Sequence, residues 1–236
     1  MAIYKPVRIY SASSYIPMVF DRLNYLSALA QGKSVLHIGC TDYPITEQRI
    51  RTGQLLHTRL QQTAAYLLGI DISKEGLQGL RDRGYSNVVE MDAEELRVDR
   101  QFDLIIAGDT LEHMSNPGRF VQAVRNALSA DGELVIGVPS AFSFNVLRLW
   151  FQCVELTHRD HIAFHSPKTL AELCGRFGLV PTRLVFTVQP PDEGETRLFV
   201  FARSCILRLF KTMAPSIIMH FRKPESVNLD RYFDWP

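Results

Sequence analysis

One polar segment of the chain, residues 155–165, gathers side chains that could move protons. It contains His158, Asp160, His161 and His165. Imidazole gains and loses a proton near neutral pH, so a histidine here could serve as the general base of a transfer reaction. His161 and His158 are the two candidates for that catalytic role. The alternative is that water covers the segment, or that its histidines cap neighbouring backbone.

Two other residues have the type and spacing of a nucleotide site. An apolar run at residues 34–38 ends at Gly39, and a second run at residues 66–70 ends at Asp71. A glycine at a strand end lets a cofactor approach the backbone, and an acidic residue at the next strand tip can bind ribose hydroxyls. Buried strands also end this way without any ligand. Residues 40–44 contain no second glycine, which argues against a dinucleotide site.

The elements that must position these residues alternate between strands and helices. Strands are expected at 34–38, 66–70, 87–91, 102–108, 133–138, 183–188 and 197–202. Helices are expected at 16–29, at 45–63 with an irregular part at Thr52-Gly53, after Ser73, after Asn116-Pro117, at 142–151, and from Ser166-Pro167 to about Gly178. This order predicts an α/β fold with a doubly wound, mostly parallel seven-stranded sheet and a terminal antiparallel strand.

Composition excludes several classes of protein. The chain has 236 residues, of which 46% are hydrophobic, enough for one sizeable core. Its net charge of +1 gives no field that would recruit nucleic acid. We expect neither a secretion leader nor a membrane span, since no apolar run approaches the roughly 18 residues that a span needs. The four scattered cysteines favour a reducing cytoplasm and give no metal-binding spacing.

Five motifs in this order resemble the class I S-adenosylmethionine-dependent methyltransferases, in particular their type 11 group. The resemblance covers about residues 30–203. The motifs are Val35-Leu36-His37-Ile38-Gly39-Cys40, Gly69-Ile70-Asp71-Ile72-Ser73, Met91-Asp92-Ala93-Glu94, Phe102-Asp103-Leu104-Ile105 with Leu111-Glu112-His113, and Asp131-Gly132-Glu133-Leu134. A looser similarity points to methyltransferases encoded among bacterial surface-glycan genes.

The resemblance implies that S-adenosylmethionine is the cofactor and assigns its binding residues. These are Gly39 for the methionine portion, Asp71 for the ribose, Ile72, Asp92 and Ala93 for the adenine, and Gly108 and Asp109 beside the sulfonium. Two departures stand out: His37 replaces an acidic residue, and Thr41 and Tyr43 replace glycines. They leave open what holds the methionine carboxylate, with Thr41, His57 and Arg59 as the candidates.

The function expected from these residues is O-methylation of a sugar or glycan-linked acceptor in the bacterial cytoplasm. The alternatives are methylation of a lipid, quinone-type or other small metabolite, and a non-catalytic protein that keeps the cofactor fold to bind a partner. We expect three segments. Residues 1–33 form a helical extension, residues 34–203 the S-adenosylmethionine-binding domain, and residues 204–236 a basic amphipathic tail.

The tail is expected to contact a membrane surface. Residues 203–223 mix apolar side chains with Lys and Arg, which is typical of a segment that lies on anionic lipid. Pro215 would divide it into two short helices. Removal of the tail should then leave cofactor binding intact. The alternative is that these apolar residues pack on the protein's own sheet or on a second subunit in a homodimer.

Overall fold

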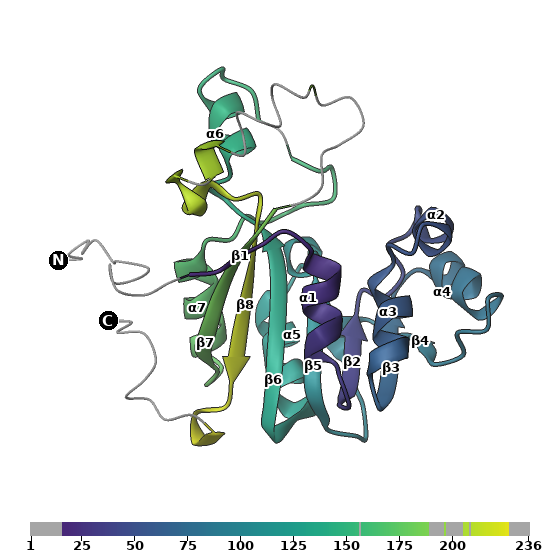
Figure 1. The fold of residues 1–236 in the computed structure, drawn as a ribbon. Coiled ribbons are helices and arrows are strands. Elements are labelled where there is room, and N and C mark those ends of the chain that lie inside the picture. The colour runs from purple at the N-terminus through teal and green to yellow at the C-terminus, as the bar shows by residue number, and fades with distance from the viewer. Residues whose placement is uncertain (1–15, 156, 189–195, 197–204, 208, 227–236) are drawn as a thin grey trace.

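The apolar runs of the chain pair into one eight-stranded sheet in the order β1-β7-β8-β6-β5-β2-β3-β4 (Figure 1). The computed structural model describes residues 16–155, 157–188, 196, 205–207 and 209–226. The strands are β1 (Met18–Val19), β2 (Ser34–Ile38), β3 (Tyr66–Asp71), β4 (Val88–Glu90), β5 (Phe102–Gly108), β6 (Leu128–Pro139), β7 (Val180–Thr187) and β8 (Ser216–Arg222). The sheet therefore has one strand more than predicted.

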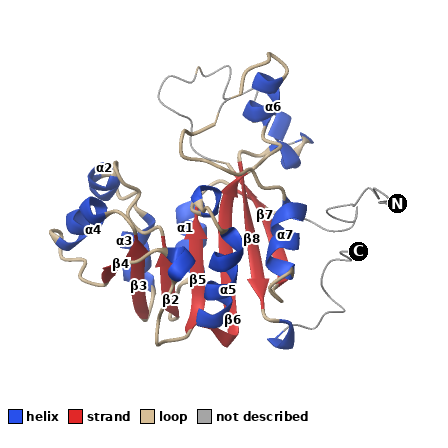
Figure 2. Ribbon diagram, turned by 180° about the vertical axis from the view of Figure 1, so that it is seen from behind, coloured by secondary structure: helices blue, strands red, loops and turns tan. Residues whose placement is uncertain are grey.

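Helices cover both faces of the sheet. The α-helices in the described part of the chain are α1 (Arg22–Leu29), α2 (Thr46–Arg51), α3 (Leu56–Thr63), α4 (Lys74–Arg81), α5 (Pro117–Ala127), α6 (Phe144–Trp150) and α7 (Pro167–Gly175). Helices α1 and α3 lie on one face, in front in Figure 1, and α5 and α7 lie on the other, in front in Figure 2. Leu26 and Leu60 pack on the first face, and Phe120 and Leu170 pack on the second.

The helix starts predicted from capping residues are confirmed. The Ser73 side chain accepts a hydrogen bond from the N–H of Gly76 at 3.0 Å, and α4 begins at the next residue. Asn116 caps α5, which has Pro117 in its first turn. Ser166 caps α7 through a capping box with Thr169. Each cap satisfies an N–H that has no partner inside the helix.

The parallel half of the sheet was predicted with nearly correct bounds. Strand β2 pairs in parallel with β3 and β5, and β3 pairs in parallel with β4. Strand β6 continues this half beside β5. It begins at Leu128 rather than at residue 133, because Leu128 pairs with Phe102 before the register shifts around Asp131-Gly132. Those two residues therefore lie within the strand instead of in a turn.

Two predicted helices are wrong in their extent. Residues 16–29 do not form one helix, since Met18–Val19 is a strand that pairs with β7. The side chain of Asp21 then accepts from the N–H of Asn24, which starts α1 at Arg22. Residues 45–63 form two helices, α2 and α3, which are separated around Gly53 at a φ of +66°, where the irregular part was predicted. Glycine adopts that backbone conformation readily, because it has no Cβ.

The proposed tail contains a central strand of the sheet, which corrects the predicted domain boundary at residue 203. Strand β8 lies between β6 and β7 and is antiparallel to both. Ile217, Ile218 and Phe221 are fully buried there, so residues 216–222 form neither a helix nor a membrane-facing surface. The alternative, packing on the protein's own sheet, is correct for these residues. The strand predicted at 197–202 lies outside the described residues.

Among the described residues, no helix is long and apolar enough to cross a membrane.

The 3-10 helices in the described part of the chain are η1 (Ala93–Glu95), η2 (Leu111–His113), η3 (Lys211–Met213) and η4 (Pro224–Ser226). Two of these short helices, η1 and η2, follow β4 and β5 and carry residues of the candidate site.

Candidate cofactor and active site

The loops after β2, β3, β4 and β5 meet at one edge of the sheet, because these four strands are parallel neighbours. Gly39, Asp71, Asp92 and Asp109 lie at or just beyond the carboxyl ends of these strands. In an open α/β sheet this edge is where ligands bind. The structure therefore brings together the residues that the sequence predicted for the cofactor.

Gly39 is a position where a side chain cannot be accommodated. Its φ is +72°, and a Cβ would lie 2.7 Å from Oγ1 of Thr110. Its N–H donates to the carbonyl of Ile70 at 2.9 Å, which holds the turn against β3. The turn after β2 therefore requires glycine, because the side chain of Thr110 occupies the place of a Cβ.

Asp71 is held in place from two directions. Its Oδ2 accepts from the N–H and the hydroxyl of Thr41 at 3.0 and 2.9 Å, and its Oδ1 accepts from the N–H of Ser73 at 2.9 Å. The carboxylate stays half-buried at the strand tip. A carboxylate fixed in this way suits the pair of ribose hydroxyls assigned to it.

The adenine residues surround the ends of β3 and β4. Ile72 is 71% exposed beside Asp71, so its apolar side chain is available for a flat ligand ring. Asp92 follows β4 and accepts from the N–H of Glu94 through Oδ1 at 2.8 Å. Ala93 is buried at the start of η1. This arrangement fits the predicted adenine contacts and adds a capping role for Asp92.

Arg22 of α1 reaches the ends of β5 and β6, a placement that the sequence did not reveal. Its guanidinium forms an ion pair with Asp109. It fits there because Gly108 and Gly137 lack side chains, since a Cβ on either would lie 2.5 or 3.0 Å from Nη2. Burial favours a lower pKa for Arg22, but Asp109 outweighs it and the pKa is raised.

None of the three predicted partners for the methionine carboxylate is well placed. Thr41 is engaged with Asp71, and His57 is fully buried behind the strands. Arg59 donates to the carbonyl of Gly53 at 2.9 Å and to Oδ1 of Asn24 at 2.7 Å. The structure instead places Arg22 at this edge, where it forms an ion pair with Asp109. A single arginine at the start of a helix gives no sequence signal that distinguishes it from a solvated surface residue.

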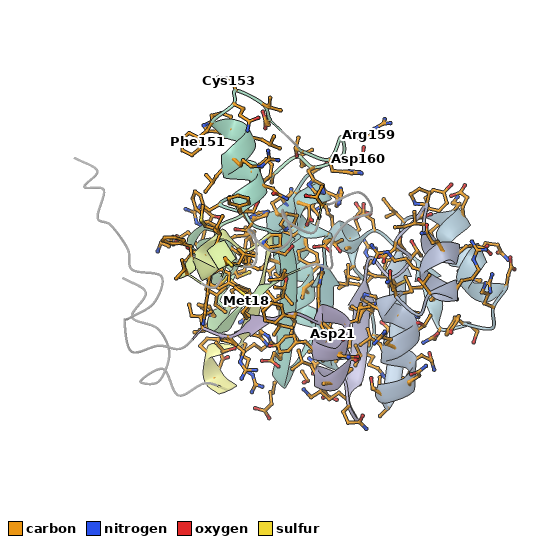
Figure 3. The ribbon with its side chains drawn as sticks, turned by 45° about the horizontal axis from the view of Figure 1, so that its top comes forward. Met18, Asp21, Phe151, Cys153, Arg159 and Asp160 are labelled. Atoms are coloured by element: carbon orange, nitrogen blue, oxygen red, sulfur yellow. The ribbon has the colours of Figure 1, made fainter. Side chains whose placement is uncertain are left out.

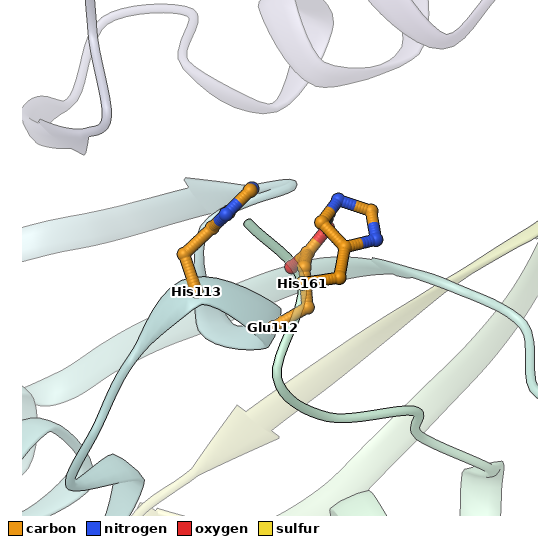
Figure 4. Close-up of side chains that lie close together, drawn as sticks. All are labelled: Glu112, His113 and His161. Carbon is orange, nitrogen blue, oxygen red and sulfur yellow. Dashed lines mark ion pairs between the residues drawn. The ribbon is translucent and has the colours of Figure 1, made fainter. Parts of the chain in front are cut away.

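The two predicted base candidates lie beside the Glu112-His113 pair of η2. The ring centroids of His113 and His161 are 4.7 Å apart, and those of His158 and His161 are 5.2 Å apart. His161 Nε2 lies 4.0 Å from Oε1 of Glu112. Figure 4 shows Glu112, His113 and His161 close together above the short helix. His165 stands apart, buried at a bridge to Ser140.

The environments of Glu112 and His161 shift their protonation in opposite directions. Burial, followed by the charge of Asp109, raises the pKa of Glu112 to about 8. Burial, followed by the neighbouring His113 and His158, lowers the pKa of His161. An imidazole that stays neutral can accept a proton, and perturbed titrations of this kind often mark functional sites.

The same cluster has the donor types of a metal site, which cysteine spacing alone could not reveal. One ligand atom each from Glu112, His113 and His161 lies within 4.8 Å of the others. His113 Nδ1 pairs with the carbonyl of Asp160 at 3.0 Å, which leaves Nε2 as its available lone pair. Two imidazoles and a carboxylate suit a divalent transition metal.

The fold and the site define the class of protein. The sheet is mostly parallel, and β8 is antiparallel between β6 and β7. The chain turns at Gly39 after β2, and a fixed carboxylate lies at the tip of β3. These features are typical of a class I S-adenosylmethionine-dependent methyltransferase. The fixed carboxylate of Asp71 and the exposed side chain of Ile72 fit the cofactor.

Comparison with known proteins gives the same class. A family described as a methyltransferase domain matches residues 13–184, and the chain belongs to this family. A ubiquinone biosynthesis O-methyltransferase of Neisseria meningitidis serogroup C is 27% identical over 175 residues, which is 67% of this chain and 69% of that protein.

Solved structures share the fold at low sequence identity. A SAM-dependent methyltransferase from Archaeoglobus fulgidus has a TM-score of 0.55 and 16% identity, over 85% of this chain and 90% of its own. The N-methyltransferase NodS from Bradyrhizobium japonicum, in complex with S-adenosylhomocysteine, has a TM-score of 0.53 and 18% identity, over 86% and 84%. This protein is therefore an S-adenosylmethionine-dependent methyltransferase.

Proposed function

We propose that this enzyme methylates a hydroxyl group on a quinone-type acceptor, a phenolic ring that carries an apolar portion. The observation that carries the proposal is the position of His161, a mostly buried imidazole with a lowered pKa at the ligand edge of the sheet. A hydroxyl is a weak nucleophile and benefits from such a base, typically by about 10²–10⁴-fold. The named relative, an O-methyltransferase of ubiquinone biosynthesis, supports the acceptor class.

In this reaction the hydroxyl oxygen bonds to the methyl carbon as the bond from carbon to sulfur breaks. S-adenosylmethionine supplies the methyl group, and the proton of the hydroxyl passes to a ring nitrogen of His161. His158 is the second candidate, since its ring lies 5.2 Å from that of His161 but is more exposed. Most of the remaining rate comes from holding the acceptor in line with the methyl group.

Arg22 is our proposed partner for the methionine carboxylate. Its guanidinium lies across Gly108 and Gly137 at the ligand edge, where no predicted candidate reaches. An arginine binds a carboxylate through two parallel hydrogen bonds. Asp109 would then give up part of its contact with Arg22 when the cofactor binds.

Three exposed apolar side chains of the protein suit the apolar portion of the acceptor. Trp150 and Phe151, at the end of α6, are 65% and 85% exposed, and Ile162 lies exposed next to His161 in the sequence. Figure 3 shows Phe151 at the outer end of α6, and Asp160 in the neighbouring loop. The predicted sugar or glycan acceptor gains no support from the Neisseria relative, whose name fits the quinone-type alternative.

Transfer of a labelled methyl group tests the proposal. The purified enzyme and S-adenosylmethionine are incubated separately with a polyprenylated catechol and with an oligosaccharide that offers only alcohol hydroxyls. We expect label on the catechol and, with His161→Ala, a kcat reduced about 100-fold at unchanged cofactor affinity. Labelling of the oligosaccharide alone would restore the glycan hypothesis. Binding of S-adenosylhomocysteine without transfer to either acceptor would favour the non-catalytic alternative.

A further inference from the structure

The side chain of Glu112 is enclosed by protein at the edge of the sheet where ligands bind. The residue is 1% exposed, although it belongs to η2, which follows shortly after the end of β5. A carboxylate is retained in such a place when it is paired, hydrogen-bonded or coordinates a metal. The imidazoles of His113 and His161 lie beside it (Figure 4). Together the three side chains offer a cation one oxygen and two nitrogen ligand atoms.

The three ligand atoms are close to the spacing that one ion requires. Each lies within 4.8 Å of the other two, and Nε2 of His161 is 4.0 Å from Oε1 of Glu112. Ligand atoms that surround a tetrahedral ion at about 2.0–2.2 Å are about 3.3–3.6 Å from one another. The atoms must therefore approach by about 1.5 Å at most, which rotations of side chains about their own bonds can supply.

The ring of His113 is held in the orientation and tautomer of a metal ligand. Its Nδ1 lies 3.0 Å from the carbonyl oxygen of Asp160. A carbonyl only accepts, so Nδ1 carries the proton and Nε2 of the neutral ring keeps its lone pair. Metal-binding histidines usually donate their other N–H to a carbonyl or a carboxylate in this way. The N–H of Ile162 also donates to the carbonyl of Glu112 at 2.9 Å, so the loop that carries His161 is fixed to η2 before any ion arrives.

The charges around the cluster favour a cation. Asp109 acts through its charge on both Glu112 and His161, and Asp160 acts on His161. Arg22 has the opposite effect on Glu112, but it is itself paired with Asp109. Carboxylates thus outnumber the guanidinium among these groups, and a surplus of negative charge attracts a divalent ion.

We propose that Glu112, His113 and His161 form a binding site for a divalent transition metal, best suited to Zn²⁺, and that an ion bound there inhibits the enzyme. Two imidazoles and one carboxylate are a donor set that zinc uses when its fourth position stays open. Mg²⁺ and Ca²⁺ prefer oxygen ligands, so they fit this set poorly.

The inhibition rests on the proposed function, whereas the metal site itself does not. The proposed base needs a free lone pair on the ring of His161. When Nε2 of that ring binds the ion, the proton of the neutral ring lies on Nδ1, and no nitrogen can accept the proton of the acceptor hydroxyl. The ion and that proton therefore compete for the same imidazole. Removal of the ion by a chelator should restore the base.

Calorimetry with Zn²⁺ and visible absorption with Co²⁺ test the site without any acceptor. We expect the chelator-treated full chain to bind about one Zn²⁺, and Co²⁺ to give the visible absorption bands of a four-coordinate site. Glu112→Gln and His113→Ala should each weaken Zn²⁺ binding at least about tenfold. Both variants should keep the Kd for S-adenosylhomocysteine within about twofold, which shows that they are folded. Mg²⁺ should give no comparable binding.

His158→Ala is the matched control for these variants. His158 and Asp160 are exposed donors in the same loop, with Nδ1 and Oδ2 3.8 Å apart, and they are the rival site for an ion. The Zn²⁺ affinity of His158→Ala should stay within about threefold of the wild type. If this variant loses as much affinity as His113→Ala, or if Glu112→Gln and His113→Ala lose none, the ion binds elsewhere and the inference is wrong.

Kinetics tests the inhibition once an acceptor is methylated. Free Zn²⁺ at about ten times its Kd fills about nine-tenths of the sites, so wild-type transfer should fall to about one-tenth and recover with EDTA. His113→Ala should resist the same concentration. Transfer that requires Zn²⁺, or that stays unchanged with the site filled, would overturn the inhibition. A chain that binds Zn²⁺ through these three residues but methylates no acceptor would refute the proposed function and leave the metal site established.

Discussion

Thr41 fixes the carboxylate of Asp71 by donating to the same oxygen, Oδ2, from its backbone N–H at 3.0 Å and from its hydroxyl at 2.9 Å. Thr41 is itself buried, and its side chain fills the space beside Gly76 in the first turn of α4. The loop after β2, the tip of β3 and the start of α4 thus form one unit. A threonine, where the family usually has a glycine, thus holds the carboxylate that is predicted to bind the ribose.

The first prediction concerns cofactor affinity. Asp71→Ala should weaken S-adenosylhomocysteine binding by about 1.5–3 kcal/mol, the scale of lost hydrogen bonds to a charged group. Thr41→Val keeps the shape but removes the hydroxyl, so we expect a smaller loss of about 1 kcal/mol. Calorimetry measures both, with the exposed Thr52→Val as the control. Wild-type affinity in Asp71→Ala would remove this carboxylate from the site.

The second prediction tests whether Arg22 binds the methionine carboxylate. Arg22→Met should weaken S-adenosylhomocysteine at least about tenfold, because a charge-assisted pair is lost. Binding of 5′-methylthioadenosine, which lacks that carboxylate, should stay within twofold. Arg59→Met serves as the control, since the guanidinium of Arg59 already donates to Gly53 and Asn24. Equal losses for the two ligands would mean that Arg22 shapes the site rather than binding this group.

The third prediction concerns the stacked pair of His37 and His57 beneath the glycine turn. Their Nδ1 atoms are 3.3 Å apart and both rings are buried. Burial lowers the pKa of His57 to about 4, and burial together with His57 and Arg22 lowers the pKa of His37 well below its usual value. The unfolded chain titrates near 6.5, so it binds more protons below that pH, and stability falls as pH decreases.

His57 alone should therefore cost the folded state about 2 kcal/mol between pH 6.5 and pH 5. Urea unfolding across this range measures the slope of the unfolding free energy with pH. His57→Phe should flatten that slope whatever its effect at neutral pH, whereas the exposed His158→Phe should not. An unchanged slope in His57→Phe would show that the buried pair is not what destabilises the protein in acid.

The parallel strands could be predicted because they are short apolar runs whose ends carry the ligand residues. The common edge of Gly39, Asp71, Asp92 and Asp109 follows from that pattern, since parallel neighbours must end at one edge. The ligand roles predicted for Asp92 and Asp109 came from the family resemblance. Strand β8 could not, because the polar His220 interrupts its apolar run. The hydrogen-bond partners of the His220 ring are Tyr25 and Glu133, at 2.8 and 3.2 Å, and both are distant along the chain.

The same distance along the chain hid two residues of the site. Arg22 pairs with Asp109 across 87 positions, and no local pattern links them. Glu112 was visible only as half of a Glu-His pair in a motif. Its burial and its approach to His161 depend on the loop after α6 folding back onto η2. Such contacts depend on tertiary packing, which periodicity and capping residues do not report.

The last prediction concerns removal of residues 204–236. This deletion takes away β8, the strand that pairs with both β6 and β7. Each fully buried apolar side chain contributes about 1.5–3 kcal/mol, so losing Ile217, Ile218, Met219 and Phe221 would consume most of a stability of about 5–15 kcal/mol. We therefore expect an unfolded or insoluble product, in contrast to the intact cofactor binding first expected of a peripheral tail.

A substitution pair tests the same point without deletion. Ile218→Asp places a charge at a fully buried position and should abolish the cooperative thermal transition and S-adenosylhomocysteine binding, whereas Leu209→Asp, at an exposed position, should preserve both. The membrane prediction then rests on exposed Leu209 and Phe210, and co-sedimentation of Leu209→Asp with anionic vesicles tests it separately. A folded truncated protein that still binds S-adenosylhomocysteine would show that β8 is dispensable, and that the sheet is held together by its parallel half alone.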